Sequence, residues 1–290
     1  MYSQTKLEAH FVLIFVFLCF LTIAGSAQGP GTQSANRKAF LGFDRNDYPG
    51  DAALRQLRDH FAFAGYWLNR APGVSVNTWE GKRAKIQNAG FGFLVLFNGR
   101  LYKQLKASGE ARKLGLTDGA VAVNAARREG FPRGTVIFLD QEEGGRMLPE
   151  QNAYIFAWVD AVNAAGFRAG VYCSGIPFQE SRDVSIVTAE DIRQNKGNRP
   201  IRFFVSNDQC PPSPGCVTPP DAPAPAGSGV PFAEVWQYAQ SPRRPGMTGQ
   251  CRQTYSQDGN CYAPDMGAVS GIFIDIDSSI SSDPSHGRTR

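Results

Sequence analysis

The sequence predicts an α/β fold, a TIM-like (β/α) barrel of eight strands in which the last strands lack intervening helices. Apolar runs of strand length alternate with segments of helical spacing between residues 39 and 197. Three further strand-like runs follow after residue 200, but Pro and Gly are frequent between them. Acidic residues stand at the ends of several runs. An open, doubly wound sheet is the alternative, although no phosphate loop or dinucleotide fingerprint follows any strand.

The strands are expected at apolar runs that are bounded by Gly, Asp, Asn or Ser. They are residues 39–44, 63–68, 91–97, 135–140, 168–174, 201–208, 233–240 and 270–277. This spacing leaves room for helices only between the early strands, which favours a barrel whose last strands are joined by loops.

Helical spacing occurs between the first six strands. The helices are expected at residues 51–61, 78–90, 117–130, 149–166 and 188–197. Asp51 and Thr78 are candidate N-caps, and Pro149 suits a first helical turn. The segment 209–231 is too rich in Pro and Gly to be helical, and we expect a loop within the domain.

The N-terminal residues predict a signal peptide. Lys6 precedes an apolar run at 11–24, and small residues follow up to Ala27. That run is shorter than the ~20 residues of a spanning helix, and an uncleaved membrane anchor is the alternative. We expect a secreted or periplasmic monomer without a stable membrane span after cleavage. The expected parts are a signal peptide (1–27), a flexible leader (28–38), the barrel domain (39–280) and a polar tail (281–290).

The net charge of +4 is mildly basic and gives no indication of nucleic-acid binding. Six cysteines are present, one of them within the predicted signal peptide. In an oxidising compartment we expect local disulfides Cys210–Cys216 and Cys251–Cys261, although the sequence does not fix the connectivity. Cys173 lies in an apolar run and is expected to be a buried free thiol.

Acidic residues recur at strand ends, where a barrel of this class carries its chemistry. They are Asp44, Asp140, Glu142, Asp208, Asp275 and Asp277. Residues two apart on a strand share a face, so Asp140 and Glu142 are expected to point into the barrel mouth and Glu143 away from it. A single strand-end acid more often caps a helix or lies in a solvated turn, but the recurrence over several strands favours a site.

Carboxylates that crowd one cleft push their pKa values apart, so that one keeps its proton and others are ionised. Cleavage of a glycosidic bond needs such a set of carboxyl groups. Aromatic rings near the same rim would provide platforms for sugar rings. Besides Asp208 and Asp277, the candidates for substrate binding are Tyr48, Trp67, Trp236 and Tyr238.

Other chemistries find less support in the residues. Only His60 and His286 remain outside the predicted signal peptide, which argues against a Ser-His-Asp triad, a zinc site or a Cys173 nucleophile. The segment "DIDSS" (275–279) resembles the start of a calcium loop, but neither glycine nor glutamate follows at the required spacing. We therefore expect no metal and no cofactor.

Five motifs in this order resemble those of glycoside hydrolase family 25, the lysozyme-type muramidases. The resemblance is closer still to a related secreted glycoside-hydrolase-like domain. The motifs are "LGFDRNDYP" (41–49), "IFLDQE" (137–142), "FRAGVYCSG" (167–175), "VWQYAQ" (235–240) and "GIFIDID" (271–277). The resemblance covers about residues 40–277 and also implies a barrel whose final strands lack helices.

The resemblance implies roles for individual residues. Glu142 would be the general acid, and Asp140 would position the substrate or assist. Asp44 and Asp275 would complete the acidic cluster. Trp236 and Tyr238 would line the groove.

Two functions follow from the resemblance and the acids. The first is an exported glycoside hydrolase that acts on a cell-wall polysaccharide, with peptidoglycan as the leading candidate. The second is a carbohydrate-binding or wall-associated barrel protein without turnover. The strand-one motif departs from the muramidases, which have a small hydrophobic residue and a serine where Arg45 and Asn46 stand. Glu143 and the Pro-rich loop are departures as well.

Overall fold

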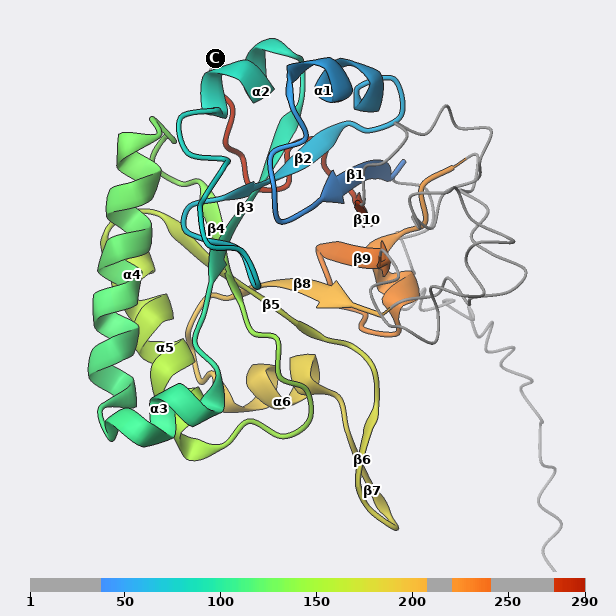
Figure 1. Ribbon diagram of the computed structural model, residues 1–290. Coiled ribbons are helices and arrows are strands. Elements are labelled where there is room, and N and C mark those ends of the chain that lie inside the picture. The colour runs from blue at the N-terminus through green and yellow to red at the C-terminus, as the bar shows by residue number, and fades with distance from the viewer. Residues whose placement is uncertain (1–37, 208–220, 241–273, 290) are drawn as a thin grey trace, which may run out of the picture. The chain divides into compact units, whose positions relative to one another are not determined.

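Eight strands close into a barrel, as the sequence predicts (Figure 1). In spatial order they are β1 (Phe40–Asp44), β10 (Asp275–Ser279), β9 (Val235–Ala239), β8 (Arg202–Ser206), β5 (Arg168–Ser174), β4 (Val136–Asp140), β3 (Gly92–Asn98) and β2 (Phe63–Trp67). The closed order excludes the open, doubly wound sheet. The predicted α/β barrel class is therefore confirmed.

The structure is a computed structural model that describes residues 38–207, 221–240 and 274–289. These residues belong to a compact unit formed by 37–290. Three predictions lie outside the described residues: the signal peptide with almost all of the leader, the binding residue Asp208, and the disulfide cysteines Cys210, Cys216, Cys251 and Cys261. Cys173 is a buried free cysteine, as expected.

One strand of the barrel, β10, runs opposite to its neighbours. This strand pairs antiparallel with both β1 and β9, whereas the other pairs in the barrel are parallel. Side chains alternate with the same period in either direction, so an apolar run does not reveal which way a strand points. Its reversal decides which end of β10 reaches the barrel mouth.

Helices cover the outside of the early strands (Figure 1). They are α1 (Asp51–Leu57), α2 (Arg83–Asn88), α3 (Tyr102–Ser108), α4 (Ala111–Arg128), α5 (Pro149–Ala164) and α6 (Thr188–Asn195). After α6 the described residues contain one 3₁₀ turn, η1 (Pro225–Ser228), and no α-helix. This agrees with the expectation that helices are lacking between the last strands.

The helices differ most from the expected ones in three places. α3 is additional, and α4 begins at Ala111, before the expected residue 117. α2 begins only at Arg83, because Gly81 at φ 74° turns the chain before it. Thr78 does not cap this helix, since its hydroxyl accepts the backbone N–H of Tyr48 at 2.8 Å.

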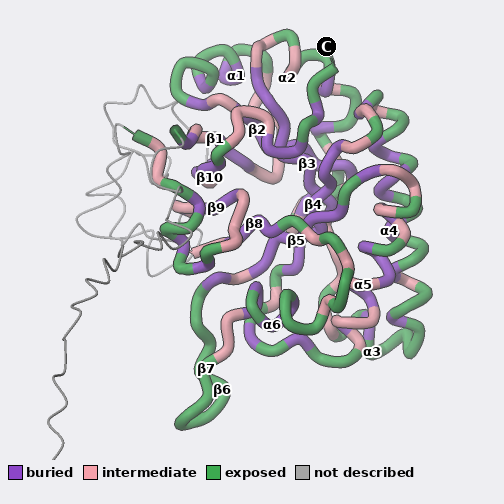
Figure 2. Tube along the Cα trace, turned by 180° about the vertical axis from the view of Figure 1, so that it is seen from behind, coloured by how far each residue is buried: buried purple, intermediate pink, exposed green. Residues whose placement is uncertain are grey.

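The barrel interior is filled by large aromatic side chains that face glycines. A Cβ atom on Gly42 would collide with the ring of Phe63, and one on Gly170 would collide with the ring of Phe138. All the strands except the short hairpin are largely buried, whereas the outer helix faces are exposed (Figure 2). At these positions the barrel is a packed core rather than an open channel.

A hairpin that the sequence did not predict projects from the body of the domain (Figures 1 and 2). It consists of β6 (Phe178–Ser181) and β7 (Val184–Ile186), which pair antiparallel. The side chains of Phe178 and Val184 are among its exposed apolar groups. The hairpin lies between β5 and α6 in the chain.

The C-terminal residues, expected to be a separate polar tail, are packed against the barrel up to residue 289. Ser285 donates its backbone N–H to Phe93 O and accepts the N–H of Val136, both at 2.8 Å. Its hydroxyl accepts the N–H of Val95 at 2.8 Å. Because Val136 is the first residue of β4 and Phe93 the second residue of β3, the segment covers the N-terminal end of the barrel. The compact unit therefore continues past residue 280.

Candidate active site

A cavity of about 510 Å³ opens at the C-terminal ends of the parallel strands. It is lined by Asp44, Asn46, Trp67, Pro72, Gly73, Leu96, Leu101, Asp140, Glu142, Tyr172, Phe204, Gln237, Gln240 and Asp275. Its volume is within the ~300–1,000 Å³ of small-molecule sites. Every strand of the barrel contributes at least one lining residue, so the cavity is the barrel mouth.

Four predicted catalytic residues line this cavity together. Asp44 is the last residue of β1 and Asp140 the last of β4. Asp275 is the first residue of β10 and pairs in register with Asp44. The sequence placed Asp275 at a strand end, but it reaches the same rim because β10 runs in the opposite direction. Glu142 follows two residues after Asp140 in the loop.

Asp140 and Glu142 differ in their surroundings. Asp140 is 4% exposed, and neither of its carboxyl oxygens meets a hydrogen-bond donor among the described residues. Glu142 is exposed at the mouth. Burial, and then the charges of Glu142 and Asp44, raise the pKa of Asp140 well above its usual range. Asp140 therefore keeps a proton that it can share with Glu142.

Asp277 lies on the same face of β10 as Asp275, one step deeper, where it has no exposed surface. Burial, followed by the charges of Asp44 and Asp275, raises the pKa of Asp277 well above the ordinary value. It is not among the residues that line the cavity. The predicted binding residue Asp277 is thus beneath the floor of the mouth, where it can hold a proton against Asp44.

Gln237 connects the acids on β1 and β10, and sequence reasoning missed it. Its Nε2 donates to Asp44 Oδ2 at 2.9 Å and to Asp275 Oδ2 at 3.3 Å. The side chain is 4% exposed and lines the cavity. An amide N–H favours the ionised form of each carboxylate that accepts it. The signal in the sequence was a polar residue between two aromatic ones on a buried strand.

Tyr172 is the second residue that sequence reasoning missed. Its hydroxyl donates to Gln237 Oε1 at 2.6 Å, and Gln240 Nε2 donates to the same oxygen at 2.8 Å. Burial, and then the charges of Glu142 and Asp140, raise the pKa of the Tyr172 hydroxyl well above the ordinary value. Tyr172 therefore remains neutral and keeps its proton for the hydrogen bond to Gln237.

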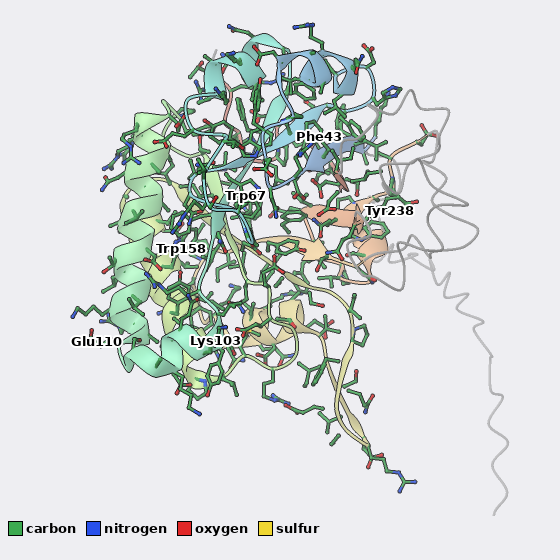
Figure 3. The ribbon with its side chains drawn as sticks, in the orientation of Figure 1. Phe43, Trp67, Lys103, Glu110, Trp158 and Tyr238 are labelled. Atoms are coloured by element: carbon green, nitrogen blue, oxygen red, sulfur yellow. The ribbon has the colours of Figure 1, made fainter. Side chains whose placement is uncertain are left out.

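Of the four predicted aromatic residues, only Trp67 lines the cavity. Its indole N–H donates to Arg45 O at 3.0 Å, which fixes the ring at the end of β2. Figure 3 shows Trp67 near the centre of the strands and Tyr238 at the periphery beside β9.

Trp236 and Tyr238 do not line the described cavity, which corrects the expectation that they face the groove. They share a face, as expected, but it is the face opposite Gln237. Trp236 is buried, donates to Asn207 O at 2.9 Å, and meets the ring of Tyr238 edge-on at 5.3 Å. Tyr48 is also absent from the lining, since its hydroxyl donates to Asp51 Oδ1 at 2.6 Å.

Glu143 points away from the cavity and stabilises the loop that carries Glu142. Its Oε2 accepts the backbone N–H of Tyr102, at the start of α3, at 2.7 Å. The same oxygen accepts Gln151 Nε2 at 2.8 Å. On the other side of the loop, Arg146 forms an ion pair with Glu180 of the β6–β7 hairpin at 2.8 Å. These contacts hold Glu142 on an ordered loop.

Two further observations concern possible metal ligands and the buried thiol among the described residues. No group of three or more His, Cys, Asp or Glu residues in that part could hold a metal ion. Burial raises the pKa of the Cys173 thiol, which makes it a poor nucleophile.

None of the helices within the described ranges is long and apolar enough to span a membrane.

Residues 75–200 match the family described as "Rv2525c-like, glycoside hydrolase-like domain". The resemblance predicted from the sequence is confirmed. The match includes the loop with Asp140 and Glu142. No curated protein matches the chain significantly.

Solved structures show the same fold. An uncharacterised protein from B. stearothermophilus has a TM-score of 0.50 and 20% identity, over 82% of this chain and 94% of its own. The Mycobacterium tuberculosis Tat-secreted protein Rv2525c has a TM-score of 0.50 and 13% identity, over 87% and 98%. The Clostridium perfringens spore cortex lytic enzyme SleM has a TM-score of 0.51 and 14% identity, over 86% and 70%. The chain thus has a glycoside hydrolase-like fold that resembles a cell-wall lytic enzyme.

Proposed function

We propose that the protein is an exported glycoside hydrolase that cleaves a cell-wall polysaccharide, with peptidoglycan as the leading candidate. The observation that carries the proposal is the pairing of buried, protonated Asp140 with exposed Glu142 in a cavity that also contains Asp44 and Asp275. Export is supported by the apolar N-terminal run and by the Tat-secreted relative from M. tuberculosis. The polysaccharide is supported by the name of SleM, a spore cortex lytic enzyme.

In the proposed reaction Glu142 protonates the glycosidic oxygen as the bond to the anomeric carbon breaks. Protonated Asp140 can donate its proton to Glu142 after Glu142 has given one to the leaving sugar. The exposed position of Glu142 suits contact with a substrate oxygen, whereas buried Asp140 suits storage of a proton. A water molecule supplies the hydroxyl group of the product and the proton that restores the pair.

The carboxylates on the opposite side of the cavity have a different role in this proposal. Gln237 donates to both Asp44 and Asp275, which favours their ionised forms. Two negative charges stabilise the positive charge that develops on the sugar ring in the transition state. The Tyr172–Gln237 hydrogen bond orients the Gln237 amide that binds these two carboxylates.

The decisive experiment is digestion of purified peptidoglycan by the secreted protein, with analysis of new reducing ends. Glu142→Gln removes the acidic proton but keeps the size and polarity of an exposed side chain. We expect a loss of roughly 10²–10⁴-fold in turnover with little change in polymer binding. Glu190→Gln makes the same chemical change at an exposed position of α6 outside the cavity and is the control for general damage. Binding without turnover in the unmutated protein would support a wall-associated binding protein and contradict the hydrolase.

A further inference from the structure

A second, smaller cavity of about 400 Å³ adjoins the acidic one. Asn69, Arg70, Ala71, Gly73, Val74 and Asn98 line it, and Gly73 lines both cavities. The segment from Ala71 to Gly73 therefore forms the wall between them. A polymer that occupies the acidic cavity can place its next unit in the neighbouring one.

The two cavities differ in charge. The described lining of the larger cavity contains four acidic residues and no Lys, Arg or His. The described lining of the smaller cavity contains one charged residue, Arg70. Arg70 is exposed, and its guanidinium makes no hydrogen bond or ion pair with any residue that the structure describes. The guanidinium is thus available to an anionic group next to a cavity that repels one.

The backbone that carries Arg70 is held firmly. Asn98 donates its side-chain amide to Arg70 O at 2.9 Å. Asn69 donates its amide to Asn98 O at 3.0 Å and accepts the N–H of Asn98 at 2.8 Å. At the other end of the wall, Asn46 donates to Pro72 O at 2.7 Å. These bonds join the loop to the end of β3, so binding does not have to order it.

We propose that the smaller cavity is a subsite for a carboxylate group of the substrate, held by Arg70. The proposal rests on the proposed polysaccharide function and specifies the substrate as an acidic glycan. A guanidinium presents two parallel N–H donors that match a carboxylate. The neutral or hydroxyl-rich part of the substrate occupies the acidic cavity, and the carboxylate of the adjacent sugar, or of a peptide attached to it, lies against Arg70.

The test measures equilibrium binding to peptidoglycan strands in the Glu142→Gln protein, so that the strands are not consumed. Strands stripped of their peptides keep a carboxylate on the sugar, and chemical reduction of that carboxylate to an alcohol gives the matched neutral ligand. Adding Arg70→Ala should weaken binding to the carboxylate strands roughly 5–30-fold and to the reduced strands less than about two-fold. Strands that retain their peptides show whether the peptide carboxylate replaces that of the sugar.

Arg112→Ala is the matched control, because Arg112 is an exposed arginine of α4 outside both cavities. It removes the same charge and should change affinity less than about two-fold. Arg70→Lys keeps the charge without the two-pronged geometry and should fall between the parent and Arg70→Ala. Unchanged binding in Arg70→Ala, or an equal loss with reduced and unreduced strands, overturns the subsite.

Failure of the subsite and failure of the hydrolase can be told apart. Binding that depends on Arg70, together with no release of reducing ends by the unmutated protein, contradicts the hydrolase and leaves the subsite standing. If turnover depends on Glu142 but not on Arg70, and reduced strands are cleaved equally well, the hydrolase stands and the carboxylate subsite is contradicted. Added salt should weaken carboxylate binding more in the Glu142→Gln protein than in the same protein with Arg70→Ala. Salt screens the attraction between Arg70 and the carboxylate, and this attraction is absent in the variant.

Discussion

The two ends of the barrel satisfy their buried polar groups in opposite ways. At the N-terminal end, Asp283 Oδ1 accepts the N–H of Phe93 at 2.8 Å, and Arg83 donates to Gly287 O at 2.7 Å. At the mouth, the carboxyl groups of buried Asp140 and Asp277 meet no hydrogen-bond donor among the described residues. At the closed end the carboxylate of Asp283 and one nitrogen of Arg83 are bound to backbone groups, although Arg83 Nε has no partner among the described residues. At the mouth, acids are concentrated, and both oxygens of these two buried carboxyl groups are without such a partner among those residues.

This difference separates stability from function within one fold. Buried polar groups are normally hydrogen-bonded, and those that are not call for an explanation. Crowded acids at the mouth destabilise the fold unless some of them keep their protons, and a residue with a shifted pKa in a cleft is a candidate for catalysis. The closed end supplies stability that the mouth gives up. Three predictions test this division.

The largest expected effect is on stability, from deletion of residues 281–290. The deletion exposes or leaves unpaired the N–H groups of Phe93, Val95 and Val136 and the guanidinium of Arg83. We expect a loss of at least roughly 5 kcal/mol, because each orphaned buried donor costs about 1–3 kcal/mol. Thermal unfolding followed by circular dichroism should show a melting temperature lower by more than about 10 °C. An unchanged melting temperature would mean that the segment is an independent tail.

The second prediction compares the same chemical change at the two ends. Asp140→Asn at the mouth should lower turnover roughly 10²-fold, because the amide cannot return a proton to Glu142. Its stability at pH 7 should be unchanged or higher, since a buried acid is replaced by a neutral group. Asp283→Asn at the closed end should cost about 1–3 kcal/mol and leave turnover intact, because Asp283 accepts three backbone N–H groups. The reverse pattern would contradict the assignment of the two ends.

The third prediction concerns pH. Asp277 has a raised pKa in the folded protein, so the native state holds a proton that the unfolded chain releases above its ordinary value of about 3.9. Stability from this group is therefore complete below about pH 4 and is lost as pH rises through the raised pKa. Asp277→Asn removes this dependence and should be about 1 kcal/mol more stable than the parent at pH 8. Urea unfolding at pH 4, 6 and 8 measures the difference, which should grow with pH.

The sequence predicts the barrel and the acidic cluster for physical reasons. Apolar runs of strand length need burial on both faces, and helices between parallel strands provide it. The acids at 44, 140, 142 and 275 stand next to such runs, where polar groups are otherwise rare. Direction is the part that periodicity does not reveal. The antiparallel β10 therefore put Asp275 at the predicted rim although it is the first residue of its strand.

The aromatic residues show a second limit. Strand alternation shows that Trp236 and Tyr238 share a face. Both faces of a barrel strand are buried, however, one in the barrel interior and one against the segments that cover the barrel. The pattern alone does not say which face looks into the mouth. Gln237 lies on the inner face because its amide and the hydroxyl of Tyr172 satisfy each other there, next to the carboxylates. A polar residue within a buried strand is the better indicator of a site.

The smallest expected effect tests this assignment of faces. Leu101 lines the cavity and is 38% exposed, whereas Tyr238 is half-buried on the other side of β9. Leu101→Ala should weaken glycan binding about 3–5-fold, since it removes part of an apolar contact with the substrate. Tyr238→Ala removes a larger ring but should change affinity less than about two-fold, measured in the same titration. A larger loss of affinity in Tyr238→Ala than in Leu101→Ala would place the glycan along the outer face of β9. The groove would then be lined by Trp236 and Tyr238, as the sequence suggested.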